Sequence, residues 1–115
     1  MKTLDQVTVV SNRDRELLRE VKEIIRESLP TADVLLYGSV ARGTQDTESD
    51  YDILVLTDSP LNRRDQNEIR GAIFDWEIER SVVVSILFRS KEEWNSPLAS
   101  VSPFRHEVEK DALAL

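Results

Sequence analysis

A stretch with two of the chain's three glycines, where two apolar runs flank a polar loop, is the feature that most restricts the fold. The runs are residues 33–38 ("DVLLYG") and 51–56 ("YDILVL"). Short apolar runs bounded by turn residues are typical of buried β-strands. We therefore expect two neighbouring strands joined by a glycine-bearing loop, with Asp50 and Asp52 at the start of the second strand.

Asp50 and Asp52 are two residues apart, which is the spacing that places two side chains on the same face of a strand. Two carboxylates so close raise each other's proton affinity unless a cation lies between them. Hard divalent cations such as Mg²⁺ bind carboxylate oxygens and keep positions for water and substrate phosphates. The pair therefore indicates a metal site, although an isolated pair of this kind is more commonly a turn end and a water-facing strand start.

The rest of the chain alternates between helical and strand patterns. The spacing of apolar residues predicts one helix over residues 11–30 and another over residues 61–79. A run rich in β-branched residues, 81–88, predicts a third strand.

Two helix-start signals follow the third strand. Ser90 and Glu93 have the spacing of a capping box, and Ser102 followed by Pro103 predicts a short C-terminal helix. The resulting order is α-β-β-α-β-α. It predicts the α/β (α+β) class, with a small mixed β-sheet and helices packed on it.

Composition limits the classes of protein that are possible. The length of 115 residues predicts one domain, residues 1–115, with one modest core. A formal charge of -7 argues against a broad nucleic-acid surface but allows a nucleotide bound with a metal. The absence of cysteine excludes a disulfide scaffold and a thiolate metal site. The polar N-terminus and the lack of an apolar run of roughly 20 residues predict a cytoplasmic protein without a membrane span.

The loop after the first strand contains residues suited to binding an anion. Gly38 allows a close approach of the backbone to a ligand, and the Ser39 hydroxyl can donate to a phosphate oxygen. Arg42 adds a cation and Gly43 a second flexible point. A plain glycine-bearing turn explains Gly-Ser alone. The full order of Gly-Ser, Ala-Arg-Gly and Ser-Asp-x-Asp between two strands is much more specific.

Residues 38–52, "GSVARGTQDTESDYD", resemble the signature of the minimal nucleotidyltransferases, in the DNA polymerase beta-like superfamily. The matching residues are Gly38, Ser39, Ala41, Arg42, Gly43, Ser49, Asp50 and Asp52. Chain size and element order are also similar to those of a stand-alone member. The resemblance implies a nucleotidyltransferase-like fold. It also implies transfer of a nucleoside monophosphate from a nucleoside triphosphate, in the first place ATP, to an acceptor hydroxyl.

The same resemblance implies roles for the matching residues. Asp50 and Asp52 would be the catalytic residues and the ligands of a divalent metal, Mg²⁺. The implied nucleotide-binding residues are Gly38, Ser39, Arg42, Gly43 and Ser49. Family members of this size are often paired with a small helical HEPN-domain protein in a toxin–antitoxin arrangement. A partner of that kind, modified with AMP by an antitoxin, is therefore the candidate acceptor.

The chain departs from the family at one position. The superfamily usually has a third carboxylate on the later strand, and the apolar pattern of that strand places Ser85 there. Serine is a poor ligand for a divalent metal, and Glu79 at the end of the preceding helix is an alternative source of a carboxylate. A second hypothesis is therefore a catalytically weak or inactive binding module, an antitoxin that acts by contact alone.

Three further residues have ordinary structural interpretations. His106 is the sole histidine, and we expect it on the surface or packed on a helix. Trp76 and Trp94 could stack on a base, but we expect both in the core.

Overall fold

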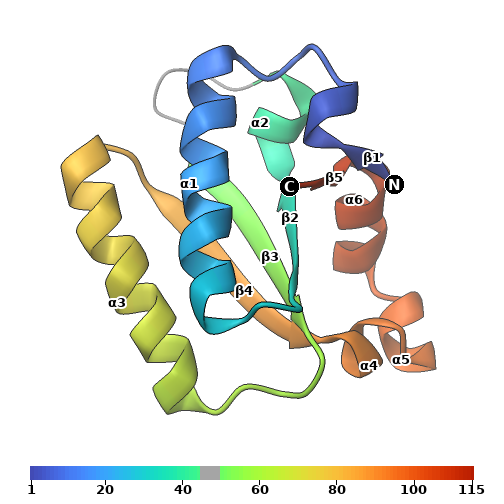
Figure 1. Ribbon diagram of the computed structural model, residues 1–115. Helices are drawn as coiled ribbons and strands as arrows, with labels where there is room; N and C mark the ends of the chain where they lie inside the picture. The colour runs from blue at the N-terminus through green and yellow to red at the C-terminus, as the bar shows by residue number, and fades with distance from the viewer. Residues whose placement is uncertain (45–49) are drawn as a thin grey trace.

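The computed structural model describes residues 1–44 and 50–115, and in this part of the chain the strands form one five-stranded mixed sheet (Figure 1). The strand order is β1-β5-β2-β3-β4. The strands are β1 (Lys2–Thr3), β2 (Asp33–Tyr37), β3 (Tyr51–Thr57), β4 (Val84–Ser90) and β5 (Leu113–Ala114). β1 with β5 and β3 with β4 are parallel, and the other two pairs are antiparallel. The predicted α/β class with a mixed sheet is confirmed.

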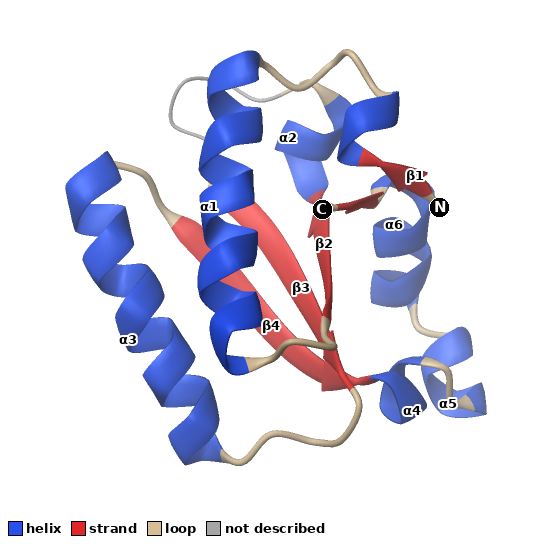
Figure 2. Cartoon of the chain, viewed as in Figure 1, coloured by secondary structure: helices blue, strands red, loops and turns tan. Residues whose placement is uncertain are grey.

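Helices pack on both faces of the sheet (Figure 2). They are η1 (Leu4–Gln6), α1 (Asn12–Ser28), α2 (Gly38–Arg42), α3 (Arg63–Arg80), α4 (Lys91–Trp94), α5 (Pro97–Ser100) and α6 (Pro103–Asp111). α1 and α3 cover one face, and α4 and α6 contribute to a second core on the other. None of the described helices is both long enough and apolar enough to cross a membrane.

Alternation along the strands builds the two cores. Ile53 and Val55 of β3 point to the larger core with α1 and α3, whereas Leu54 and Leu56 point to the smaller core around Trp94. All four side chains are buried. A strand buried on both faces reads as a continuous apolar run, which explains why the sequence of β3 shows no polar alternation.

The main elements lie where the sequence predicts them, with differences at their ends. The third strand starts at Val84 and not at Ser81, because Ser81 has a left-handed backbone (φ 56°) that closes α3. The Ser90–Glu93 capping box is present, and α6 begins at Pro103 as expected. Ser102 precedes α6 without a side-chain capping bond.

Five short elements differ from or add to the prediction. η1, β1, β5 and α5 are too short to give a periodic signal, and residues 38–42 form helix α2 instead of an open turn. Trp76 and Trp94 are buried and His106 is exposed, which confirms the expectations for these three side chains.

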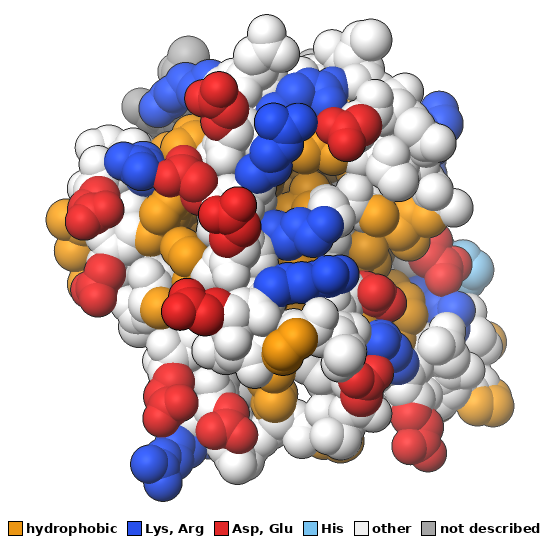
Figure 3. Space-filling model, in the orientation of Figure 1, with side chains coloured by type: hydrophobic (Ala, Val, Ile, Leu, Met, Phe, Trp, Pro, Cys, Tyr) orange, Lys and Arg blue, Asp and Glu red, His pale blue; other side chains and the backbone are white. Residues whose placement is uncertain are grey.

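The face formed by α1 and α3 carries interspersed cationic and anionic side chains (Figure 3).

β4 is an edge strand whose outward-facing backbone is bonded to side chains of α3. The Val84 N–H donates to the Glu77 carboxylate at 2.9 Å, and the Ile86 carbonyl accepts from the Arg70 guanidinium at 3.0 Å. Arg70 also lies over the Phe88 ring, 5.1 Å from its centroid. α3 therefore packs on the sheet and also covers part of its edge.

Arg15 of α1 holds the N-terminal segment in place. Its side chain, 15% exposed, donates to three backbone carbonyls: Leu4 at 2.6 Å, Val10 at 3.1 Å, and Val7. Backbone carbonyls in an irregular segment need such partners when they are withdrawn from water. One guanidinium therefore organises the chain between β1 and α1.

We expect Arg15→Met to lower the free energy of unfolding by about 2–4 kcal/mol, because three carbonyls lose a charged donor. Urea denaturation measures this change. The matched control is Arg19→Met, because exposed Arg19 pairs with Asp5 alone at 3.4 Å, and it should change stability by less than about 0.5 kcal/mol. Equal effects of the two substitutions would contradict the role given to Arg15.

Candidate functional site

Asp50 and Asp52 lie at the start of β3. Asp52 is the second residue of the strand and half-buried, whereas Asp50 precedes the strand and is exposed. Tyr51 between them is buried on the opposite side and donates to the Asp14 carboxylate in the first turn of α1. Burial and the bond to Asp14 raise the pKa of Tyr51, so its phenol remains a donor and fixes the start of β3 against α1.

The two carboxylates interact electrostatically. Burial raises the pKa of Asp52, the charge of Asp50 raises it further, and the Arg42 guanidinium opposes both effects. Within the described residues, neither carboxylate has an ion-pair partner within 4.0 Å. The Asp52 carboxyl therefore lies within the electrostatic influence of both Asp50 and Arg42.

Gly38 lies directly against Asp52. Gly38 has a left-handed backbone (φ 79°) at the start of α2, and a Cβ atom added there would lie 2.2 Å from Oδ2 of Asp52. A side chain at this position would therefore force the carboxylate to move. The glycine is required by its conformation and by the close approach of α2 to β3.

Ser39 and Arg42 are placed by α2. Ser39 is half-buried in the first turn of the helix, and its carbonyl accepts from the Thr44 N–H at 3.0 Å. Arg42, at the end of the helix, pairs with Asp111 of α6 at 3.3 Å and still acts on the pKa of Asp52. Its charge is therefore shared between α6 and the candidate site.

Gly43 has a structural reason for being glycine. It closes α2 in a left-handed conformation (φ 73°), and an added Cβ would lie 2.7 Å from Cβ of Val9 in the N-terminal segment. Ser49, which the family resemblance places in the nucleotide-binding set, lies outside the described residues. The nucleotide-binding roles of Gly43 and Ser49 remain predictions.

Ser85 of β4 is the register partner of Asp52, as the apolar pattern of the strand predicts. Partners in adjacent strands share a face, so a hydroxyl lies beside Asp52 where the family usually has a carboxylate. Glu79 is exposed at the end of α3, and Glu77 bonds the outer edge of β4. Neither glutamate is among the charges that shift the pKa of Asp52.

The donor set suits a divalent cation that arrives with its substrate. Among the described residues, no three or more His, Asp or Glu side chains are grouped to hold a metal ion. Two carboxylates without an ion-pair partner among the described residues fit Mg²⁺, which usually keeps several waters and takes one or two carboxylates together with substrate phosphates. Asp50 and Asp52 would hold it.

Comparison with known proteins defines the class. Residues 18–112 match the nucleotidyltransferase domain family, and this range includes both aspartates. The chain therefore belongs to this family. The match covers most of the chain, and the fold described above is that of a nucleotidyltransferase.

Two similar proteins come from Methanocaldococcus jannaschii. "Putative protein adenylyltransferase MJ1379" is 40% identical over 55 residues, which is 48% of this chain and 48% of that protein. "Putative protein adenylyltransferase MJ0141" is 26% identical over 94 residues, 82% of this chain and 93% of that protein. The chain thus matches about half the length of the first relative and nearly all of the second.

Two solved structures share the fold. One, "Crystal structure of putative nucleotidyltransferase", has a TM-score of 0.60 at 24% identity and covers 85% of this chain and 96% of the other. The second, "Crystal structure of the toxin-antitoxin with AMP-PNP", has a TM-score of 0.59 at 21% identity and covers 84% and 69%. At these identities the likeness concerns the fold.

We expect Gly38→Ala to lower the free energy of unfolding by about 1–2 kcal/mol, because alanine is strained at this positive φ. The added methyl group also displaces the Asp52 carboxylate. Gly71→Ala is the matched control: Gly71 is an exposed residue of helix α3, and an added Cβ there meets nothing within 4 Å. It should raise stability by about 0.5–1 kcal/mol. Urea denaturation of both variants checks the two opposite signs, and a Gly38→Ala protein as stable as the wild type would contradict the assignment.

Proposed function

We propose that this chain transfers a nucleoside monophosphate from ATP to a hydroxyl group of a partner protein, with Mg²⁺ bound by Asp50 and Asp52. The observation that carries the proposal is the contact of Gly38 with Asp52, beside a second carboxylate. The start of α2 thus lies against Asp52, one of the two carboxylates proposed to hold the metal, in a chain of the nucleotidyltransferase family.

Each residue then has a specific task. Bound Mg²⁺ would supply charge neutralisation for the phosphates and the leaving group. Asp50 and Asp52 hold the cation, and Gly38 keeps the backbone close to Asp52 so that phosphates can approach. Ser39, beside Gly38, offers a hydroxyl for a phosphate oxygen. Arg42 contributes positive charge from the end of α2.

The acceptor is the less constrained part of the proposal. The two relatives with adenylyltransferase names, and the neighbour solved as a toxin–antitoxin with AMP-PNP, support ATP as donor and a toxin as acceptor. The family resemblance adds a small helical HEPN-type protein as the candidate toxin. In this arrangement the chain is the antitoxin, and modification of the toxin neutralises it.

Ser85 favours a second candidate function, neutralisation by contact without catalysis. A serine hydroxyl beside Asp52 is neither a general base at neutral pH nor a good ligand for a divalent cation. In this case the chain would bind its partner, and chemistry at Asp50 and Asp52 would not be needed for neutralisation.

We expect Asp52→Asn to reduce Mg²⁺-dependent transfer by about 100-fold or more, since a metal-binding charge is removed. The measurement is incorporation of labelled AMP from ATP into the co-purified partner, with and without a chelator. Asp75→Asn, at an exposed position of α3, is the matched control and should retain full activity. Neutralisation that persists unchanged in Asp52→Asn would instead support the contact mechanism.

We expect Ser85→Asp to raise transfer about tenfold or more, because it restores a carboxylate beside Asp52 that can activate the acceptor hydroxyl. The same labelling assay measures the gain, and Ser85→Asn, of similar size but uncharged, is the control. Equal rates for the wild type and both variants would show that the position does not participate.

Binding can be tested before the acceptor is known. We expect a non-hydrolysable ATP analogue to shift the amide resonances of Gly38, Ser39, Asp50 and Asp52, and to require Mg²⁺ for the effect. An NMR titration with and without Mg²⁺ measures this. Absence of shifts at millimolar analogue would refute the nucleotide site.

A further inference from the structure

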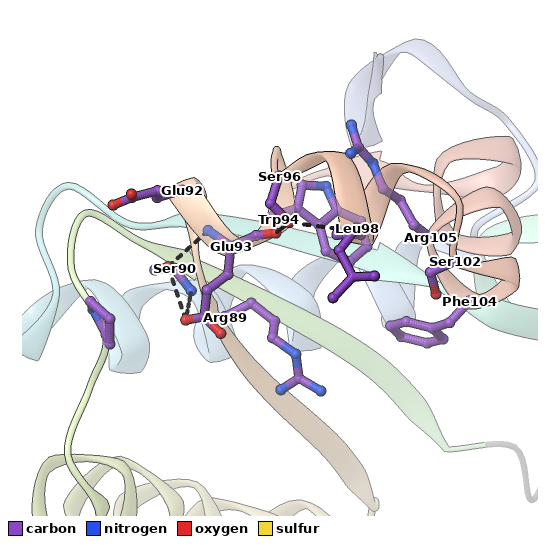
Figure 4. Close-up of a pocket in the computed structure, with 12 residues that line it drawn as sticks. Arg89, Ser90, Glu92, Glu93, Trp94, Ser96, Leu98, Ser102, Phe104 and Arg105 are labelled. Atoms are coloured by element: carbon purple, nitrogen blue, oxygen red, sulfur yellow. Dashed lines mark hydrogen bonds between the residues drawn. The ribbon is translucent and has the colours of Figure 1, made fainter.

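A cavity of about 760 Å³ lies beyond the candidate site, between the end of β4 and the segment α4–α6 (Figure 4). Its size is within the range of pockets that bind small ligands. The lining side chains that matter here are Arg89, Trp94, Leu98, Ser102, Phe104 and Arg105. None of them is part of the family signature at residues 38–52.

The cavity opens on the same sheet face as Asp52. Ser85 is the register partner of Asp52, and Arg89 lies four residues further along β4, so both side chains point to one face. Four residues of a strand span about 13 Å. The reach of a nucleotide, from its phosphates through the ribose to the far edge of the base, is of this order.

An aromatic pair connects the two places. Tyr37 is the register partner of Asp52 on the other neighbouring strand, and its ring meets Phe104 edge to face with centroids 5.7 Å apart. Burial and the charge of Asp52 raise the pKa of Tyr37, and the charge of Arg89 lowers it. Tyr37 is thus a strand neighbour of Asp52 and also contacts Phe104 in the cavity wall.

The cavity walls provide apolar contacts and the cationic side chain of Arg89. Leu98 is 83% exposed and Phe104 is 38% exposed. Arg89 of β4, Leu98 of α5 and Phe104 of α6 all line the cavity, and Figure 4 shows their side chains. Planar aromatic ligands gain affinity by stacking on such surfaces.

Arg89 has no carboxylate partner among the described residues, whereas Arg105 has one. The Arg89 guanidinium donates to the Phe88 carbonyl at 2.8 Å and has no ion-pair partner within the described residues. Arg105 pairs with Glu109 at 3.0 Å and lies over Trp94. Because a guanidinium has donors only, Arg89 suits a ligand edge with hydrogen-bond acceptors, such as the ring nitrogens of a base.

We propose that this cavity binds the base of the nucleotide, with Leu98 and Phe104 against the ring and Arg89 on its acceptor edge. This inference rests on the proposed function, which places the triphosphate at Asp50 and Asp52. It assigns the choice of nucleotide to α4–α6, a segment outside the signature loop.

The test separates the base from the phosphates by comparing two ligands. Calorimetry measures the Kd of Mg²⁺-ATP and of Mg²⁺-tripolyphosphate, which has no base, for the wild type, Arg89→Ala and Leu98→Ser. Both positions are exposed, so both variants should fold. We expect the Kd for ATP to rise about tenfold in each variant, while the Kd for tripolyphosphate stays unchanged.

Matched controls are available for each variant. Val101→Ser changes a 71% exposed apolar residue that does not line the cavity, and Arg63→Ala removes an exposed arginine of α3. Both should bind ATP as the wild type does. Cavity variants that behave like these controls would overturn the assignment.

The remaining outcomes are also decisive. Equal Kd values of the wild type for ATP and tripolyphosphate would overturn the base site and leave the proposed function standing. Equal weakening of both ligands by Arg89→Ala would place Arg89 on phosphate and overturn its assignment to the base. Failure of the wild type to bind either ligand with Mg²⁺ would refute the proposed function and this inference with it.

Discussion

The approach of Gly38 to Asp52 is the constraint on which the site depends. Without a side chain at Gly38, α2 can begin in a left-handed conformation immediately after β2 and still meet the carboxylate of the neighbouring strand. The antiparallel pairing of Tyr37 with Asp52 sets this contact, because it brings the end of β2 level with the start of β3. Tyr51 then ties β3 to α1 through Asp14. The position of the site is thus fixed by the pairing of β3 with β2 and by the packing of Tyr51 against α1.

The parallel register of β3 and β4 has two effects on the same face. It places Ser85 beside Asp52, which leaves the site with two carboxylates, and it places Arg89 further along the face, where the cavity opens. The helical segment that follows β4 encloses the cavity through Trp94 and Phe104, whose rings meet edge to face at 6.2 Å. The residues proposed to hold the phosphates and those proposed to hold the base are therefore separated by about the length of four residues of β4.

The sequence predicts the sheet, the two long helices and the position of Ser85, because each rests on a local pattern or on one alignment of apolar runs. It does not predict β1 and β5, since strands of two residues have no periodicity and pair only in the folded chain. It also treats residues 38–42 as a loop, whereas Val40 and Ala41 bury one side of α2 in the core. Tyr37, Arg89 and Phe104 come together through tertiary packing. The alternation of side chains along β4, counted from Ser85, is the sequence signal that could have placed Arg89 on the same face as Asp52.

The covered edge of β4 restricts how other chains can attach. An exposed edge strand invites a neighbouring strand to continue the sheet, which leads to self-association. Here Glu77 already occupies the Val84 N–H and Arg70 the Ile86 carbonyl, so an incoming strand would have to displace two charged side chains. Main-chain recognition at this edge is therefore disfavoured. A partner that attaches at this edge has to recognise side-chain surfaces, so β4 is protected from joining the sheets of other β-rich proteins.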